Sequence, residues 1–553
     1  MRKTIYLLYV MSLLCITSTV MAQINTDMRP QVKSPEVNKF EQYMNLPVNL
    51  VSGTPQVSIP IYTLEYGGMT LPISLEYDAS GVKVESIASS VGQNWSLNVG
   101  GVVSRNVKGA PDEGAVSAST KSLIEINGYY KDYGLTKLDL LLNNFSSSAP
   151  LNARYSQFNW WLEDVNAGKK DAQPDLFYFS TPEGGGKFVF NDQRKVVYLE
   201  NTDFMIQEGF VPNYFRTWMV TSPRGIKYKF GLDTGTEFGA NNVVEKNYTN
   251  QSIDEITFAN NFRINSWFLT EISNYTSSNT IQLEYVDNNY THRIINKPMV
   301  QGGFLCLPNS TTLNSNCKES AVGQYASIAE HPVNTTSQSH VMSKVISKIK
   351  AGTTQINFIY SNRDDVTPEF GVTPKRLDEI QITVVNPTTQ LPQIIRKIKF
   401  SYTTLQSAIT SGSLDATDIK RLQLIGMTEM DTSEQLSKPY TFVYNTTSLP
   451  SKLSFAQDKW GYYNGKTQNP SLFPPAGITL NTSMYADRKV NVNFAKAGIL
   501  EQIVYPTKGS VNFEYESHKS DLAVDVYYDV TNPSPLVSSI SSTQSTNGIN
   551  SAL

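Results

Sequence analysis

The stretch Ile356-Asn357-Phe358-Ile359-Tyr360 follows a pattern that recurs along this chain of 553 residues. Each copy has a large apolar residue, a spacer, a second large apolar residue, another spacer and a tyrosine. The other copies are Ile73-Ser74-Leu75-Glu76-Tyr77, Ile281-Gln282-Leu283-Glu284-Tyr285, Ile398-Lys399-Phe400-Ser401-Tyr402, Tyr440-Thr441-Phe442-Val443-Tyr444 and Val511-Asn512-Phe513-Glu514-Tyr515. Alternation with a period of two places the large residues on one face, so each copy predicts a half-buried β-strand.

A second apolar element precedes four of these copies. It consists of two aliphatic residues three positions apart, namely Leu269 and Ile272, Ile346 and Ile349, Leu377 and Ile380, and Leu500 and Ile503. Turn-forming residues such as Gly352 and Gly509 lie between this element and the tyrosine strand, which predicts a series of β-hairpins. Residues three apart point to opposite faces of a regular strand, so the spacing indicates either a β-bulge or a late start of the strand.

The fold class follows from the need to bury the aromatic face of each hairpin. One hairpin cannot do this alone, whereas hairpins stacked side by side remove that face from water. We therefore expect a mainly β fold with antiparallel hairpins stacked into large twisted or wound sheets, with tandem β-sandwich modules as the alternative. Apolar residues at roughly helical spacing within residues 122–144 and 155–165 predict a small, partly helical insertion.

The N-terminus has the layout of a signal peptide. Met1-Arg2-Lys3 carries positive charge, a mostly apolar run extends from Ile5 to Val20, and a cleavage pattern ends at Ala22. The run is shorter than the roughly 20 apolar residues of a transmembrane helix, and no later stretch is long enough. We expect an exported protein that resides in the periplasm, on the outer-membrane surface or outside the cell.

Two cysteines remain after removal of the signal peptide, Cys306 and Cys317. An oxidising compartment permits a disulfide between them, and two free thiols in a loop are the alternative. The net charge of -3 comes without a long basic run, so nucleic acid is not an expected partner.

No set of residues has the spacing of a catalytic or metal site, so we expect no enzyme activity and no cofactor. The four histidines are scattered and lack a cysteine at zinc-ligand spacing: His292, His331, His340 and His518.

One group of residues is a candidate ligand platform. Trp460, Tyr462 and Tyr463 place aromatic rings beside the carboxyl group of Asp458, an arrangement that suits a glycan. The alternative is an aromatic plug that seals the end of a sheet, because large rings more often pack than bind.

Three stretches carry a family resemblance. They are residues 71–101, which include Tyr77-Asp78-Ala79-Ser80-Gly81 and Val91-Gly92-Gln93-Asn94-Trp95, residues 453–465 and residues 495–515. Together they resemble the N-terminal region of the large secreted RHS/YD-repeat proteins of Gram-negative bacteria. The resemblance implies a lead-in to a β-sheet shell that can enclose a toxin or effector. It also implies, as partners, a downstream YD-repeat or toxin segment or other envelope components.

These features divide the chain into eight segments. They are a signal peptide (1–22), a linker (23–45), a first β module (46–110), the partly helical insertion (111–172), a second β module (173–300), a loop with the candidate disulfide (301–340), the repeated hairpins (341–516) and a disordered or linker tail (517–553). The expected function is that of an exported β-scaffold with a structural, surface-display or effector-packaging role. An adhesin or glycan-binding surface module is the alternative, and a secreted hydrolase is a third.

Overall fold

The computed structural model describes residues 54–108, 112, 115–119, 122–126, 174–191, 195–211, 214–231, 242–250, 263–275, 278–295, 300–301, 329–330, 336–386, 388–389, 391–407, 414–431, 437–472, 486–517, 519–520 and 545–546. These residues belong to one compact unit, residues 48–553. Within them, the helical elements are the short α6 (Val492–Ala495) and a 3-10 turn at Ala416–Asp418. Antiparallel strands predominate, most of them in one large sheet, so the expected mainly β fold is confirmed. In the described part of the chain, no helix is both long and apolar enough to span a bilayer.

The first β module begins with a three-stranded antiparallel sheet of β1 (Gln56–Tyr66), β2 (Met69–Asp78) and β3 (Trp95–Val99). Every second residue of β2 is buried, as the alternating sequence predicts. After β3 the chain passes directly into the large sheet as β4 (Val102–Asn106). This passage needs glycine at Gly101, where φ is 137° and a Cβ atom would lie 2.1 Å from the carbonyl oxygen of Ser180.

Within the described residues, the large sheet has 21 strands and two arms that share the long strand β14 (Arg263–Asn274). The N-terminal half of β14 pairs with β4 and β13, and its C-terminal half pairs with β12 and β15. Besides β4, the first arm contains β7 (Leu176–Thr181), β8 (Gly184–Phe190), β9 (Val196–Tyr198), β13 (Val244–Asn250), β16 (Tyr290–Ile295), β19 (Thr336–Met342) and β22 (Thr367–Pro368).

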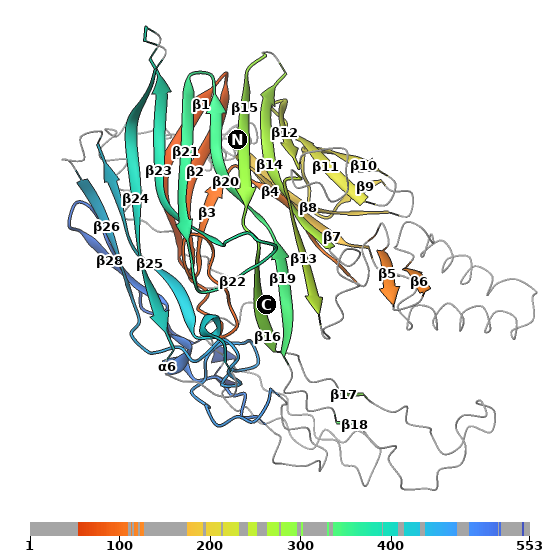
Figure 1. Cartoon of the computed structure of the whole chain (residues 1–553), viewed down its shortest axis with the longest axis vertical. Coiled ribbons are helices and arrows are strands. Elements are labelled where there is room, and N and C mark those ends of the chain that lie inside the picture. Colours follow the sequence, from red (N-terminus) through yellow and green to blue (C-terminus); the bar gives the residue numbers. More distant parts are fainter. Residues whose placement is uncertain are drawn as a thin grey trace, which may run out of the picture. The chain divides into compact units, whose positions relative to one another are not determined.

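The second arm holds the repeated hairpins and is called here the repeating arm. Its strands lie side by side in nearly the order of the chain (Figure 1). They are β10 (Met205–Val211), β11 (Tyr214–Thr221), β12 (Ile226–Phe230), β14, β15 (Thr280–Asp287), β20 (Lys344–Ala351), β21 (Thr354–Asn362), β23 (Lys375–Val385), β24 (Pro392–Gln406), β25 (Lys420–Met430), β26 (Ser437–Tyr444), β27 (Leu500–Val504) and β28 (Ser510–Asn512).

The four expected hairpins are present as β14–β15, β20–β21, β23–β24 and β27–β28. The spacing of three residues is a β-bulge in every case. The register against the neighbouring strand shifts directly after Leu269, Ile346, Leu377 and Leu500. Because the extra residue of the bulge restores the alternation, both aliphatic residues of each pair face the core and are buried.

A fifth hairpin of the same kind, β25–β26, was not predicted from the sequence. Its first strand has a bulge between Leu424 and Met427, and both side chains are buried. Methionine stands where the other copies have isoleucine, and this departure hid the repeat.

In each of the five hairpins, a tyrosine hydroxyl links the second strand to the first. It donates a hydrogen bond to the backbone carbonyl of the aliphatic residue that precedes the bulge. The pairs are Tyr285 with Leu269 (2.7 Å), Tyr360 with Ile346 (2.7 Å), Tyr402 with Leu377 (2.6 Å), Tyr444 with Leu424, and Tyr515 with Leu500 (2.8 Å). We call this row the tyrosine ladder. Burial raises the pKa of all five hydroxyls, so they stay protonated as donors.

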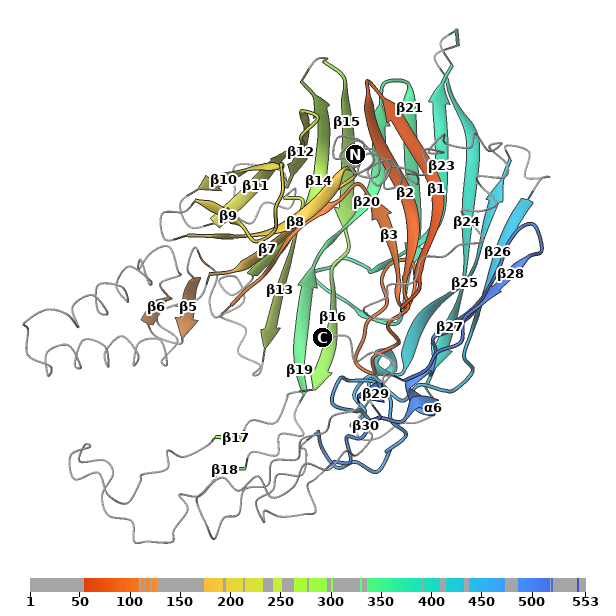
Figure 2. The same ribbon diagram turned by 180° about the vertical axis from the view of Figure 1, so that it is seen from behind.

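The three-stranded sheet packs against the ladder. The indole Nε1 of Trp95 donates to the hydroxyl oxygen of Tyr444 at 2.7 Å, and the Tyr77 hydroxyl accepts from the backbone N–H of Leu500 at 2.9 Å. Figures 1 and 2 show β1–β3 lying over the strands of the repeating arm. One hydrophobic core unites the three predicted β modules, since it includes residues of the N-terminal sheet and of both arms.

Several segments differ from the sequence prediction or lie outside the described residues. Ser122–Ile126, the start of the expected helical stretch, is instead strand β6 and pairs with β5 (Ala115–Ser119). Isoleucine at every second position favours a strand there. Apart from Asp112, the remainder of the insertion is outside the described residues, as are Cys306 and Cys317.

Short strands also fall within the expected loop and tail. β19 begins at Thr336, inside the loop expected over 301–340, and it pairs with β13 and β16. β17 (Val300–Gln301) pairs with β18 (Ala329–Glu330), and β29 (Lys519–Ser520) pairs with β30 (Ser545–Thr546).

The tyrosine ladder predicts the effect of removing one hydroxyl. Tyr360→Phe leaves the carbonyl of Ile346 without its donor, so the free energy of unfolding should fall by about 1–2 kcal/mol. Urea unfolding followed by tryptophan fluorescence measures this. Tyr275→Phe is the control, because Tyr275 is 81% exposed and should unfold like the wild type. Equal midpoints for both variants would show that the ladder contributes no stability.

Candidate functional site

The aromatic loop that contains Trp460 is organised by Asp458. One carboxylate oxygen of Asp458 accepts from the backbone N–H of Trp460 (2.9 Å) and of Tyr462 (3.0 Å). The guanidinium of Arg488 donates to the backbone carbonyl of Asp458 and fixes the loop from the other side. Burial raises the pKa of the Asp458 carboxyl, and its second oxygen has no hydrogen-bond partner among the described residues.

The rings of the predicted ligand platform do not share an exposed face. Trp460 is 39% exposed, whereas Tyr462 and Tyr463 are 4% and 3% exposed and Asp458 is fully buried. The ammonium of Lys83 lies 5.8 Å from the centre of the Tyr462 ring, and Phe494 packs edge-on against Tyr463. In this conformation, Trp460 alone of the three rings is open to a ligand.

The loop joins segments that lie far apart in the sequence. Val82 and Val84 come from the stretch 71–101, Ala456 and Tyr463 from 453–465, and Ala497 from 495–515, and together they form a small buried cluster. Backbone bonds reinforce the junction, since the N–H of Val84 donates to the carbonyl of Gly461 at 2.9 Å. The three stretches quoted for the family resemblance therefore pack on one another.

A second candidate site lies where the repeating arm opens. β23 pairs with β24 only from Glu379 onward, and residues 88–94, here called the wedge loop, bond to β23 and β25. The N–H of Leu377 donates to the carbonyl of Ser90 (2.9 Å), and the N–H of Gln93 donates to the carbonyl of Leu422 (2.8 Å). A Cβ atom at Gly92 would come within 2.8 Å of the nitrogen of Leu424, so only glycine fits this approach.

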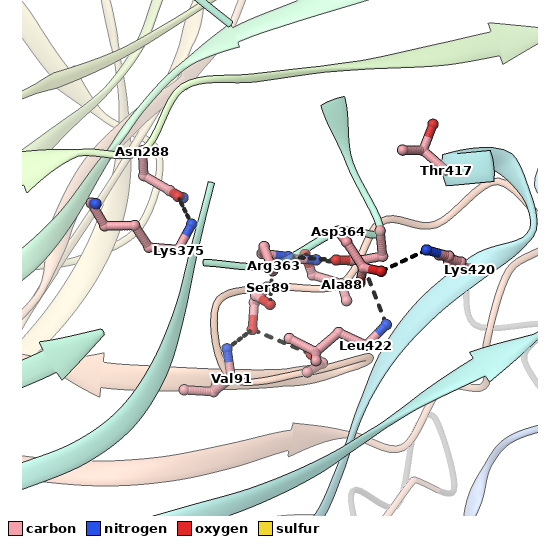
Figure 3. A network of polar contacts seen from close by, with 12 residues as sticks. Ala88, Ser89, Val91, Asn288, Arg363, Asp364, Lys375, Thr417, Lys420 and Leu422 are labelled. Carbon is pink, nitrogen blue, oxygen red and sulfur yellow. Dashed lines mark hydrogen bonds and ion pairs between the residues drawn. The ribbon is translucent and has the colours of Figure 1, made fainter. Parts of the chain in front are cut away.

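Buried charges hold the wedge loop in place (Figure 3). The guanidinium of Arg363 makes two bonds of 2.6 Å to the carboxylate of Asp365 and also donates to the carbonyls of Ser89 and Ala88. Asp365 in turn accepts from the N–H of Leu422 at 3.2 Å. Burial acts to raise the pKa of Asp365, but bonding to Arg363 and the nearby cations outweigh it and hold that pKa below its usual value.

Two more cations lie beside this pair. The ammonium of Lys452 donates to the carbonyls of Asp365 (2.7 Å) and Thr417 (3.0 Å), and Arg421 donates to the carbonyl of Val84 and to the hydroxyl of Ser407. Burial lowers the pKa of Lys452 to about 8 and that of Arg421 to about 10. Three of these four hydrogen bonds end on backbone carbonyls, so the two cations hold loops in place.

Two of the four histidines lie close to this cluster, on neighbouring strands. Thr291, beside His292, pairs with His340, whose Nδ1 lies 3.4 Å from the carboxylate of Glu369. Burial, reinforced by Lys452 and His340, lowers the pKa of His292 to about 4. His331 and His518 lie outside the described residues. Among the residues the structure describes, no three His, Cys, Asp or Glu side chains are placed to hold a metal ion.

Comparison with known proteins adds no relative: no family model matches the chain, and no curated protein matches it. The resemblance to RHS/YD-repeat proteins therefore depends on the residues quoted for it.

The ion cluster was missed in the sequence because its members are far apart. Arg363 and Asp365 lie 56 to 58 residues from Arg421 by their numbers, and Lys452 lies further along. No spacing rule connects such positions. The one available signal was the wedge loop itself, since Val91-Gly92-Gln93-Asn94-Trp95 is part of the stretch that carries the resemblance.

The buried pair predicts a large loss on removal of one partner. Arg363→Met leaves Asp365 buried without its cation, which should lower the free energy of unfolding by about 3–5 kcal/mol. Arg224→Met is the control, because Arg224 pairs with Glu183 at the surface and should lose less than about 1 kcal/mol. The double change Arg363→Met with Asp365→Leu should recover part of the loss. Similar urea midpoints for the two single variants would contradict a structural role.

His292 predicts a pH dependence of stability. Its pKa is about 4 in the folded protein against 6.5 for the free side chain, so the unfolded chain binds a proton first as the pH falls. Stability should therefore be lost between pH 6.5 and 4, on the order of 1–3 kcal/mol from this group. In His292→Gln this part of the loss should be absent. Parallel curves of unfolding free energy against pH for the two proteins would refute the assignment.

Proposed function

We propose that this chain is an exported β-scaffold of the bacterial envelope or exterior, similar to the N-terminal module of an RHS/YD-repeat protein. The tyrosine ladder carries the proposal. Five hairpins use the same bulge and the same hydroxyl bond to build one continuous sheet. Such a repeat specifies an extended surface whose length depends on the number of hairpins, which suits a structural or display role.

The distribution of charge supports the same role. Ion pairs connect neighbouring strands of the repeating arm, such as Arg396 with Glu429 (2.7 Å) and Lys350 with Glu284. The opposite face is apolar and packs on the three-stranded sheet. An antiparallel sheet with one face in the core and one face in water is stable as a wall.

The clustered cations also favour a structural role over a chemical one. Arg363, Arg421 and Lys452 hold loops through backbone carbonyls, and they lie beside the wedge loop of the stretch 71–101. The resemblance suggests what the scaffold serves, namely surface display or the packaging of a downstream YD-repeat or toxin segment. No catalytic step is part of the proposal.

Export is tested by expressing the full chain in a Gram-negative host. N-terminal sequencing of the accumulated protein should give Gln23, and cell fractionation should find it outside the cytosol. A matched chain that starts with Met followed by Gln23 should stay in the cytosol. If the full chain keeps Met1 and remains in the cytosol, the proposal is wrong.

A glycan array separates the scaffold from the glycan-binding alternative. The purified mature chain should give no specific signal. A signal that is lost in Trp460→Ala, while the urea midpoint is unchanged, would favour the binding module instead.

A further inference from the structure

The tyrosine ladder contains a pairing rule that extends from one hairpin to the next. At every internal junction, the tyrosine of one hairpin lies opposite the aliphatic residue that precedes the bulge of the following hairpin. The pairs are Tyr285 with Ile346, Tyr360 with Leu377, Tyr402 with Leu424 and Tyr444 with Leu500. Each tyrosine strand therefore accepts one type of neighbour, an antiparallel strand with a bulge directly after a leucine or isoleucine.

The last tyrosine strand, residues 511–515, makes the same contacts with the preceding strand, β27, as the earlier copies make with theirs. The Tyr515 hydroxyl donates to the carbonyl of Leu500 at 2.8 Å, and the N–H of Phe513 donates to the carbonyl of Glu501 at 2.8 Å. Residues 513–515 are thus held at the place where the earlier copies have their second apolar residue and tyrosine.

The outer side of this strand differs from that of the earlier copies. Within the described residues, β28 pairs with β27 alone, and the strand ends at Asn512 where earlier tyrosine strands continue to their tyrosine. Val511 is half-buried, whereas Ile281, Ile356 and Ile398 at the same position are buried. Each earlier tyrosine strand of the repeating arm has a bulged strand on its outer side. Within the described part of the chain, residues 510–515 have none.

We propose that the outer edge formed by β28 and the residues after it, from Ser510 to Tyr515, binds a β-strand of a separate polypeptide by strand addition. The incoming strand runs antiparallel and carries the sequence Leu-x-x-Ile with a bulge after its leucine. Its leucine lies opposite Tyr515, as Leu500 lies opposite Tyr444. Main-chain hydrogen bonds then supply affinity, and the leucine and isoleucine side chains on the inner face supply specificity.

A second copy of this chain does not meet the rule through its own β28. That edge offers Val511, Phe513 and Tyr515 at alternate positions and has no bulge. Pairing two such edges would place a tyrosine strand against a tyrosine strand, which occurs at none of the four internal junctions. The rule therefore selects a strand of the bulged type from a different chain.

The test uses a strand that this fold already recognises. A fluorescent peptide copy of residues 375–385, the bulged strand β23, is titrated with the purified mature protein, and its anisotropy is measured. Binding should saturate. A peptide in which Leu377 and Ile380 are both replaced by aspartate should bind at least about tenfold more weakly, because it lacks the apolar side chains that lie opposite a tyrosine strand.

Protein variants locate the binding edge. Asn512→Pro removes a main-chain donor from β28 and should weaken binding at least about tenfold, whereas Gln56→Pro at the edge strand β1 should not. The proposal is overturned if the two peptides bind equally, if the full peptide does not saturate, or if Gln56→Pro weakens binding as much as Asn512→Pro. A dimer of the protein alone that the peptide fails to dissociate would assign the edge to a second copy.

This inference deepens the scaffold role proposed above by naming a partner. The binding assay uses purified protein, so its failure would leave the export result unchanged, and failed export would leave the binding result unchanged.

Discussion

The hydrogen bond between a tyrosine hydroxyl and the carbonyl before a bulge is the contact on which the repeating arm depends. A bulge lets two aliphatic residues three apart both face the core, but it takes one residue out of the strand pairing. A buried carbonyl without a donor costs about 1–3 kcal/mol. The hydroxyls of Tyr285, Tyr360, Tyr402, Tyr444 and Tyr515 supply that donor, so each hairpin keeps its buried face at no loss of hydrogen bonding.

Two backbone N–H groups at the bulges donate to acceptors in the N-terminal module. Leu377 donates to the wedge loop at Ser90, and Leu500 donates to the hydroxyl of Tyr77 in the three-stranded sheet. The N-terminal module thus completes the polar contacts of the repeating arm as well as covering its apolar face. The buried cations Arg363 and Arg421 secure the same module by binding the carbonyls of Ser89 and Val84, and Lys452 binds the carbonyl of Asp365 beside them. Hydrogen bonds as well as apolar contacts therefore hold the two sheets together.

Strands and hairpins could be predicted because alternation is a local signal, and Ile356–Tyr360 shows it in five residues. The choice between a bulge and a late strand start at Leu377 and Ile380 could not, because it depends on the register of the neighbouring strand. Met427 was missed because the repeat was defined by isoleucine. The platform at Trp460 could not be assigned from sequence, since adjacent rings give no sign of which face packs; Tyr462 and Tyr463 face inward. The ion cluster depends on contacts across the whole chain.

The bond between Tyr77 and Leu500 joins residues 423 positions apart, and that between Trp95 and Tyr444 joins residues 349 apart. Strands β2 and β3 are synthesised more than 300 residues before their partners in these bonds. A ribosome must therefore synthesise the chain past Leu500 before the core can close. Topologies with such distant pairings fold slowly, and early segments wait with apolar rows uncovered. A chaperone that binds the unfinished chain would therefore have to stay bound longest to the N-terminal strands β1–β3.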